Sequence, residues 1–157
     1  MEVIVITSPT HRENEVQRIV HLFENGLQTL HLRKPKWKSS ELETLIKDIP
    51  EMFHNRIIIH GHYKLALKYK LKGIHLHRKH RSNKWKNRWK RFLLKMRSPN
   101  LVITTTFNSL ESLRENTQHF DYVFLGSVFN SHSYYSRDEE AGMNMLKSIV
   151  KKSPSIV

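Results

Sequence analysis

Residues 30–35, with the sequence Leu-His-Leu-Arg-Lys-Pro, form a short apolar strand pattern that ends in two cations. The same kind of pattern recurs at residues 72–77 (Lys-Gly-Ile-His-Leu-His) and 121–129 (Asp-Tyr-Val-Phe-Leu-Gly-Ser-Val-Phe). Helix-like sequence separates the three stretches. In parallel α/β folds, ligands bind at the C-terminal ends of the strands. The three stretches therefore indicate where a binding site would lie.

The rest of the chain alternates between strand and helix patterns. Short apolar runs predict strands, and amphipathic stripes between them predict helices. Two helix starts carry a capping-box pattern, at Ser40–Glu43 and Asn108–Glu111. The expected strands are residues 3–7, 29–33, 56–60, 74–77, 101–106 and 122–129. The expected helices are residues 16–23, 40–49, 63–70 and 84–97, one that begins near residue 108, and one that begins near residue 138.

Six consecutive βα units with short loops require parallel strands joined by right-handed crossovers. An open doubly wound sheet and part of a (βα)₈ barrel both meet this requirement, and the pattern alone does not separate them. No Gly-x-Gly-x-x-Gly follows the first strand, so nothing supports a dinucleotide-binding fold. The length of 157 residues fits one domain with its own core.

Composition excludes several classes of protein. The chain has no cysteine, which rules out disulfides and cysteine-based zinc or redox chemistry. Met1 runs directly into an apolar strand without a charged leader, which argues against a signal peptide. No apolar run approaches the roughly 20 residues that a membrane span needs. We therefore expect a soluble cytoplasmic protein that does not bind a membrane.

The net charge of +13 comes from one segment. Arg78–Arg97 holds ten of the 27 basic residues and no acidic residue, and the remainder is nearly balanced. A helix over residues 84–97 would place Trp85, Trp89 and Phe92 on one face, which would suit nucleic acid or an anionic membrane surface. We favour the alternative in which this is an outer helix, with those aromatic side chains packed on the strands and the lysines in water. Nucleic-acid binding is then not expected.

The order and spacing of these stretches resemble the thiamine phosphate synthase family and its relatives, the thiazole tautomerases, from Val3 to Val157. In that family the second strand ends in Gln-Leu-Arg-Glu-Lys, where this chain has residues 31–35. The fourth strand reads Gly-Val-His-Leu-Gly-Gln, where this chain has residues 73–78. The sixth reads Asp-Tyr-Ile-Gly-x-Gly-Pro-Val-Phe, and residues 121–129 match it with Ser127 in place of proline, which is the most specific of the three matches.

The resemblance implies a fold and an activity. The family fold is a (βα)₈ TIM-type barrel, so residues 1–157 are expected to form one such domain, incomplete with about six βα units. The family reaction belongs to thiamine biosynthesis: it joins an aminopyrimidine pyrophosphate to a thiazole phosphate and releases pyrophosphate. The implied partners are therefore phosphorylated small molecules. At the matching positions, the implied substrate- and phosphate-binding residues are His31, Arg33, Lys34, His60, Thr106, Ser131 and Ser133.

Magnesium is implied by the family, but its ligands are not matched here. Family synthases hold this ion with two aspartates, one after the third strand and one after the fourth. In this chain Gly61 stands at the first position and the second falls near His80, and imidazole is a poor ligand for magnesium. The missing carboxylates argue against full synthase activity. A catalytically silent relative that binds a thiamine precursor or regulates a partner is therefore the alternative.

Four histidines at strand ends resemble a metal cluster at first sight. His60 and His62 share one strand face, and His75 and His77 share another. Neither a carboxylate nor a well-spaced third ligand is evident, so we expect no metal site, and a structural hydrogen bond for His75. Asn108 stands near the position of the tautomerase histidine, but we interpret it as a helix cap.

The last five residues, 153–157, resemble the start of a seventh strand. Six units alone cannot close a barrel, so the strands at residues 3–7 and 122–129 would be left as unpaired edges. Exposed apolar edges favour association. We therefore expect a homo-oligomer.

Overall fold

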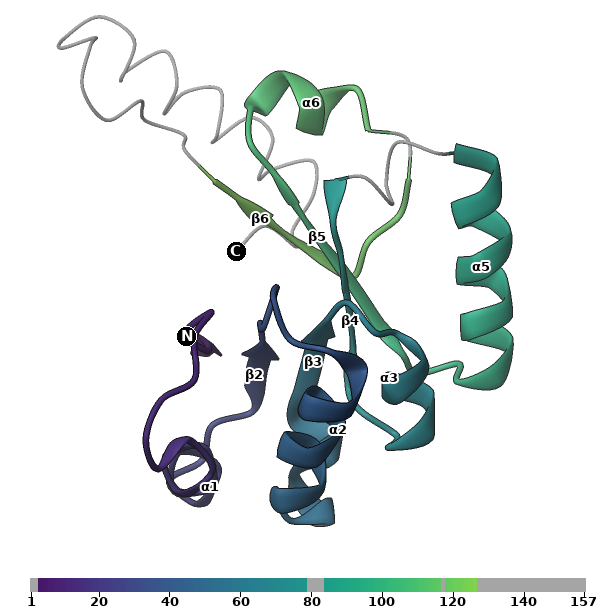
Figure 1. The fold of residues 1–157 in the computed structure, drawn as a ribbon. Coiled ribbons are helices and arrows are strands. Elements are labelled where there is room, and N and C mark those ends of the chain that lie inside the picture. The colour runs from purple at the N-terminus through teal and green to yellow at the C-terminus, as the bar shows by residue number, and fades with distance from the viewer. Residues whose placement is uncertain (1–2, 79–83, 117, 127–157) are drawn as a thin grey trace, which may run out of the picture. The chain divides into compact units, whose positions relative to one another are not determined.

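The computed structural model describes residues 3–78, 84–116 and 118–126 (Figure 1). The chain divides into two compact units, residues 1–102 and 103–157. In chain order the elements are β1 (Ile4–Ile6), α1 (Glu15–Glu24), β2 (Thr29–Leu32), α2 (Ser39–Asp48), the 3₁₀ helix η1 (Glu51–Arg56), β3 (Ile57–His60), α3 (Lys64–Lys68), β4 (Gly73–Leu76), α5 (Lys84–Arg97), β5 (Val102–Phe107), α6 (Leu110–Arg114) and β6 (Tyr122–Leu125). No helix in these ranges is both long and apolar enough to cross a membrane.

In the first unit, strands β1 to β4 pair in sequence order, and every pairing is parallel. The register aligns His31 with Ile58, Ile58 with Gly73, and His60 with His75. Since strand side chains alternate between two faces, these residues share one face of the sheet. Every residue of β2, β3 and β4 is buried. The sheet is therefore covered on both faces, as parallel sheets require.

The opposite face of this sheet packs against helices. Leu30 and Leu32 of β2 are fully buried, as are Leu42 and Ile46 on the inner side of α2. Phe23 of α1 stacks on Phe53 of η1, with ring centroids 5.1 Å apart. This apolar layer holds the sheet against the helices. The other face of the sheet carries His31, His60 and His75.

The second unit contains a parallel pair of strands joined through α6. Thr104 of β5 aligns with Tyr122 of β6. The Asp121 carboxylate accepts a hydrogen bond from the Ile103 N–H at 2.7 Å and so ties the start of β6 to β5. Phe107 contacts Phe120 edge to face in the core of this unit, with ring centroids 6.2 Å apart.

The predicted strands are confirmed in number and order, and each is shorter than or close to its expected length. The sequence did not predict η1, because its six residues carry no helical stripe long enough to recognise. The predicted end of the sixth strand beyond residue 126 and the helix expected near residue 138 lie outside the described residues.

Two helix starts differ from the prediction. Helix α2 begins at Ser39, and the Glu41 carboxylate accepts a hydrogen bond from the Lys38 N–H at 2.7 Å. The N-cap of α6 is Ser109, whose hydroxyl accepts from the Ser112 N–H. The interpretation of Asn108 as the cap was therefore wrong by one residue.

The prediction that the aromatic face of α5 packs on the strands is also wrong for the residues whose side chains are described. Trp89 is 62% exposed and Phe92 is 54% exposed, and their rings contact each other at 6.1 Å. Leu93 and Met96 share this exposed face. The half-buried side of the helix carries Leu94 instead, so the helix is rotated relative to the expected orientation.

Candidate binding site at the C-terminal strand ends

Three histidines gather on one face of the sheet at the C-terminal ends of its strands. His31, His60 and His75 come from β2, β3 and β4, and all three are buried. Nδ1 of His31 lies 2.9 Å from Nε2 of His60, which is a hydrogen bond between the two rings. The rings of His60 and His75 stack with centroids 4.1 Å apart and planes tilted by 12°. We call these three residues the histidine cluster.

Burial lowers the pKa of every imidazole in the histidine cluster. It lowers the pKa of His31 to about 4, with a smaller effect from the charge of Lys72. It lowers the pKa of His60 to about 2 and that of His75 to about 3, and the neighbouring histidines and Arg33 act in the same direction. At neutral pH the three rings are therefore uncharged, and each retains one nitrogen that can accept a hydrogen bond or bind a cation.

Arg33 follows β2 on the same side as His31. Its backbone N–H donates to the hydroxyl of Thr7 at 2.9 Å, which fixes the main chain at the strand end. Its side chain is exposed. Within the described part of the chain, its guanidinium has no ion-pair partner. Among the described residues, Arg33 is therefore a cation without an acidic partner, and its charge helps to lower the pKa of His60 and His75.

Lys34 has a different environment, although the sequence grouped it with Arg33. Its side chain is buried, and its ammonium donates to Glu15 Oε1 at 2.5 Å and to the Thr10 carbonyl at 2.7 Å. It also lies 4.9 Å from the centre of the Trp37 ring. This ammonium is engaged within the fold, and its predicted phosphate contact stays a prediction.

The remaining predicted residues lie outside the first unit. Thr106 is half-buried on β5, in the second unit. Ser131 and Ser133 lie outside the described residues. Their roles in phosphate binding stay predictions.

The comparisons with known proteins identify the family. A family model described as thiamine monophosphate synthase matches residues 3–157. The chain belongs to the thiamine monophosphate synthase family. A crystal structure of thiamine phosphate pyrophosphorylase from Bacteroides thetaiotaomicron is 31% identical, with a TM-score of 0.70 over 96% of this chain and 68% of that chain.

A thiamine phosphate pyrophosphorylase from Pyrococcus furiosus is 21% identical, with a TM-score of 0.60 over 82% of this chain and 61% of that chain, and it shares the fold. No curated protein matches. The expected fold class, α/β of the (βα)₈ barrel type with six strands here, is confirmed. Membership of this family supports a function related to thiamine biosynthesis and phosphorylated small-molecule substrates.

Magnesium, the ion implied for this family, does not fit the donors at these strand ends. Gly61 follows β3 where the family carries an aspartate, and it has φ of 94°. The next residue, His62, directs its ring to the Trp37 carbonyl at 3.0 Å. The position near His80 lies outside the described residues. The grouped donors here are imidazole nitrogens, whereas magnesium requires oxygen ligands.

Sequence reasoning missed the third histidine of the cluster. It compared histidines two apart along one strand, whereas His31, His60 and His75 lie on three neighbouring strands. Adjacent strands are about 4.8 Å apart, which is closer than residues i and i+2 of one strand. When the three strands are aligned, the three histidines occupy positions whose side chains lie on the same face of the sheet. This alignment was the signal that could have revealed the cluster.

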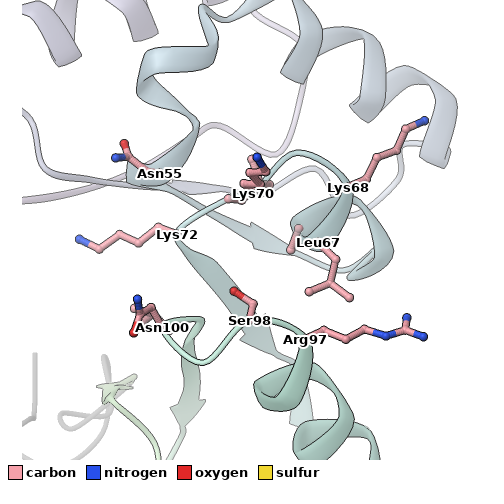
Figure 2. Close-up of a pocket in the computed structure, with 11 residues that line it drawn as sticks. Asn55, Leu67, Lys68, Lys70, Lys72, Arg97, Ser98 and Asn100 are labelled. Atoms are coloured by element: carbon pink, nitrogen blue, oxygen red, sulfur yellow. The ribbon is translucent and has the colours of Figure 1, made fainter.

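A hollow of about 700 Å³ lies at the N-terminal ends of the strands (Figure 2). Lys68, Lys70, Lys72 and Arg97 contribute cations to its lining. Two of them are engaged: Lys68 pairs with a glutamate of α2, and Lys72 donates to main-chain and hydroxyl oxygens of the first unit. In barrels of this type, residues at the N-terminal strand ends serve stability, so we assign no ligand to this hollow.

Proposed function

We propose that this chain is a thiamine phosphate synthase-like protein that binds an aminopyrimidine pyrophosphate and a thiazole phosphate. The observation that supports this most is Arg33, an exposed cation at the C-terminal end of β2 in a chain of this family. A guanidinium that has no acidic partner among the described residues suits a doubly charged phosphate group, which it can bind through two parallel hydrogen bonds.

In this proposal Arg33 holds the pyrophosphate and stabilises the negative charge that grows on it as it leaves. His31 and His60 line the pyrimidine pocket. Because burial keeps both rings neutral, they add no positive charge beside the pyrimidine cation through which the family reaction passes. Thr106, Ser131 and Ser133 offer hydroxyls to the thiazole phosphate. Lys34 contributes only if its ion pair with Glu15 opens.

The second candidate is a catalytically silent relative that binds the same precursors. The observation that favours it is the set of donors after β3, where Gly61 replaces the expected carboxylate between two histidines. Without oxygen ligands, a magnesium ion that would neutralise pyrophosphate is held only by the substrate itself.

One experiment separates these candidates. The purified protein is mixed with aminopyrimidine pyrophosphate, thiazole phosphate and Mg²⁺, and thiamine phosphate and released pyrophosphate are measured by chromatography. Formation of thiamine phosphate supports the synthase. Calorimetric binding of both precursors without product favours the silent relative, and binding of neither precursor contradicts both.

The exposed face of α5 favours a candidate function of another class, the binding of nucleic acid. Trp89 and Phe92 lie exposed on a helix that carries seven of the ten cations of the basic segment. Aromatic side chains among cations bind single strands by base stacking, and such binding weakens steeply with salt. Fluorescence anisotropy with a single-stranded DNA, at low and physiological salt, tests this. Unchanged anisotropy at low salt excludes it.

A further inference from the structure

We propose that the histidine cluster of His31, His60 and His75 is a binding site for a zinc-type transition-metal dication. This inference does not depend on the proposed function. It uses His31 and His60, which that function places in the pyrimidine pocket as uncharged rings, so a metal on them and a pyrimidine cation beside them exclude each other.

The three donors converge by virtue of the sheet register. One ring nitrogen from each histidine lies within 4.8 Å of the corresponding nitrogens of the other two. Each residue comes from a different strand of one parallel sheet, so the backbone hydrogen bonds of the sheet hold their Cα positions. Donors carried on rigid strands give a more defined site than donors on loops.

The spacing is close to that of a ligated metal. With Zn–N bonds of about 2.0–2.1 Å and tetrahedral angles, two ligand nitrogens lie about 3.3 Å apart. The nitrogens of His31 and His60 are 2.9 Å apart, so they would move apart by about 0.4 Å to reach this spacing. The third nitrogen must move closer by about 1.5 Å at most, which side-chain rotation of His75 can supply. Binding would replace the hydrogen bond between His31 and His60 with two metal bonds, and the ring that donates this hydrogen bond would change tautomer, so that its proton moves to its other nitrogen.

The chemistry of the donors selects the metal. Neutral imidazole binds zinc, cobalt, nickel and copper ions and is a poor ligand for magnesium and calcium. Three histidines leave a fourth position open, as in catalytic zinc sites.

The charges around the histidine cluster determine which kind of ligand would occupy the fourth coordination position of the metal. Arg33 and Lys72 both act on these histidines, so a bare dication meets positive charge. An anionic fourth ligand, such as hydroxide or a phosphate oxygen, would offset that repulsion. The ring of His77 is the other nearby donor, with its centroid 6.1 Å from that of His60.

The alternative is a purely structural trio held by ring hydrogen bonds and stacking. A titration with Co²⁺ distinguishes the metal site from the structural trio. The protein carries no tag and is first stripped of metal with a chelator. The visible absorption of bound Co²⁺ then reports the number and type of its ligands. We expect one Co²⁺ per chain, the intense d–d bands of a four-coordinate site, and displacement by Zn²⁺ but not by Mg²⁺. Absence of stoichiometric binding overturns the proposal.

Two variants locate the ion. His60→Gln is expected to weaken Co²⁺ binding at least 100-fold, whereas the matched change His21→Gln, on the exposed surface of α1, is expected to leave it unchanged. Binding that survives His60→Gln overturns the assignment. Should His60→Gln not fold, X-ray absorption of the zinc-loaded wild type decides: three imidazole ligands support the site, and fewer than three contradict it. Arg33→Ala is expected to retain the metal, which keeps this test separate from that of the phosphate site.

Discussion

Arg33 and Lys34 are neighbours in sequence, but their side chains face opposite sides of the sheet. Leu30, Leu32 and Lys34 share one parity, and this parity leads to the helix-covered face, where Glu15 of α1 lies. Arg33 shares the parity of His31 and faces the strand ends. The parity of Lys34 and an acidic residue in the first turn of α1 were the signals that predict its ion pair.

The Lys34–Glu15 ion pair is expected to support the fold. Because the partners are 2% and 7% exposed, removing one leaves a buried charge. Lys34→Met should lower the free energy of unfolding by about 3 kcal/mol, measured by urea denaturation. Adding Glu15→Gln to this variant should restore much of the loss. The control Lys36→Met, at an exposed neighbouring position, should change it by less than about 0.5 kcal/mol, and a similarly small effect at Lys34 would contradict this account.

The histidine cluster is expected to make the metal-free protein sensitive to acid. The pKa values of His31, His60 and His75 lie below 6.5 in the folded protein, whereas they lie near 6.5 in the unfolded chain. Below pH 6.5 the unfolded state therefore binds more protons, so stability falls as the pH falls. The slope should approach about 1.4 kcal/mol per pH unit for each histidine between pH 6 and 5.

This pH dependence is measured by urea denaturation with a chelator present at pH 7, 6 and 5. His60→Gln should reduce this slope by the contribution of one histidine, about 1.4 kcal/mol per pH unit. A free energy of unfolding that is the same at pH 7 and pH 5 would show that the cluster does not hold its histidines neutral.

At the scale of elements, the strands follow from sequence and the exact contacts between them do not. The apolar runs predict β1 to β6 because each is short, branched and bounded by turn residues. The exposed face of α5 was not predictable, since a helical stripe shows which residues share a face but not whether that face is covered. The cluster of histidines likewise required the strand register.

Gly73, at the start of β4, occupies a position where strand packing leaves no room for a side chain. A Cβ at this position would lie 2.1 Å from the carbonyl oxygen of Val102, a backbone atom that cannot rotate away. Gly73→Ala should therefore lower the free energy of unfolding by about 2 kcal/mol or more. Gly126→Ala is the matched control, because its Cβ would have no neighbour closer than 3.6 Å. Equal melting temperatures for the two variants would contradict the close approach.

At the scale of the whole molecule, the sequence predicted the family and the fold class, because the order of the βα units and the motifs at three strand ends are both local patterns. The site was only partly predictable. Arg33 is exposed at a strand end as expected, but the partner of Lys34 and the third histidine depend on contacts between distant segments. The expected homo-oligomer and the roles of Ser131 and Ser133 stay predictions.

The central claim is an anion-binding site at the C-terminal strand ends that depends on Arg33. It is tested most directly by the melting temperature of the protein with and without pyrophosphate. Pyrophosphate should raise the melting temperature by mass action, and Arg33→Ala should remove this rise while changing the unliganded stability by less than about 1 kcal/mol. The double change Lys86→Ala and Arg88→Ala on α5 should leave the rise intact. A rise that persists in Arg33→Ala and disappears in the α5 variant would contradict the account and place the anion site on the basic helix.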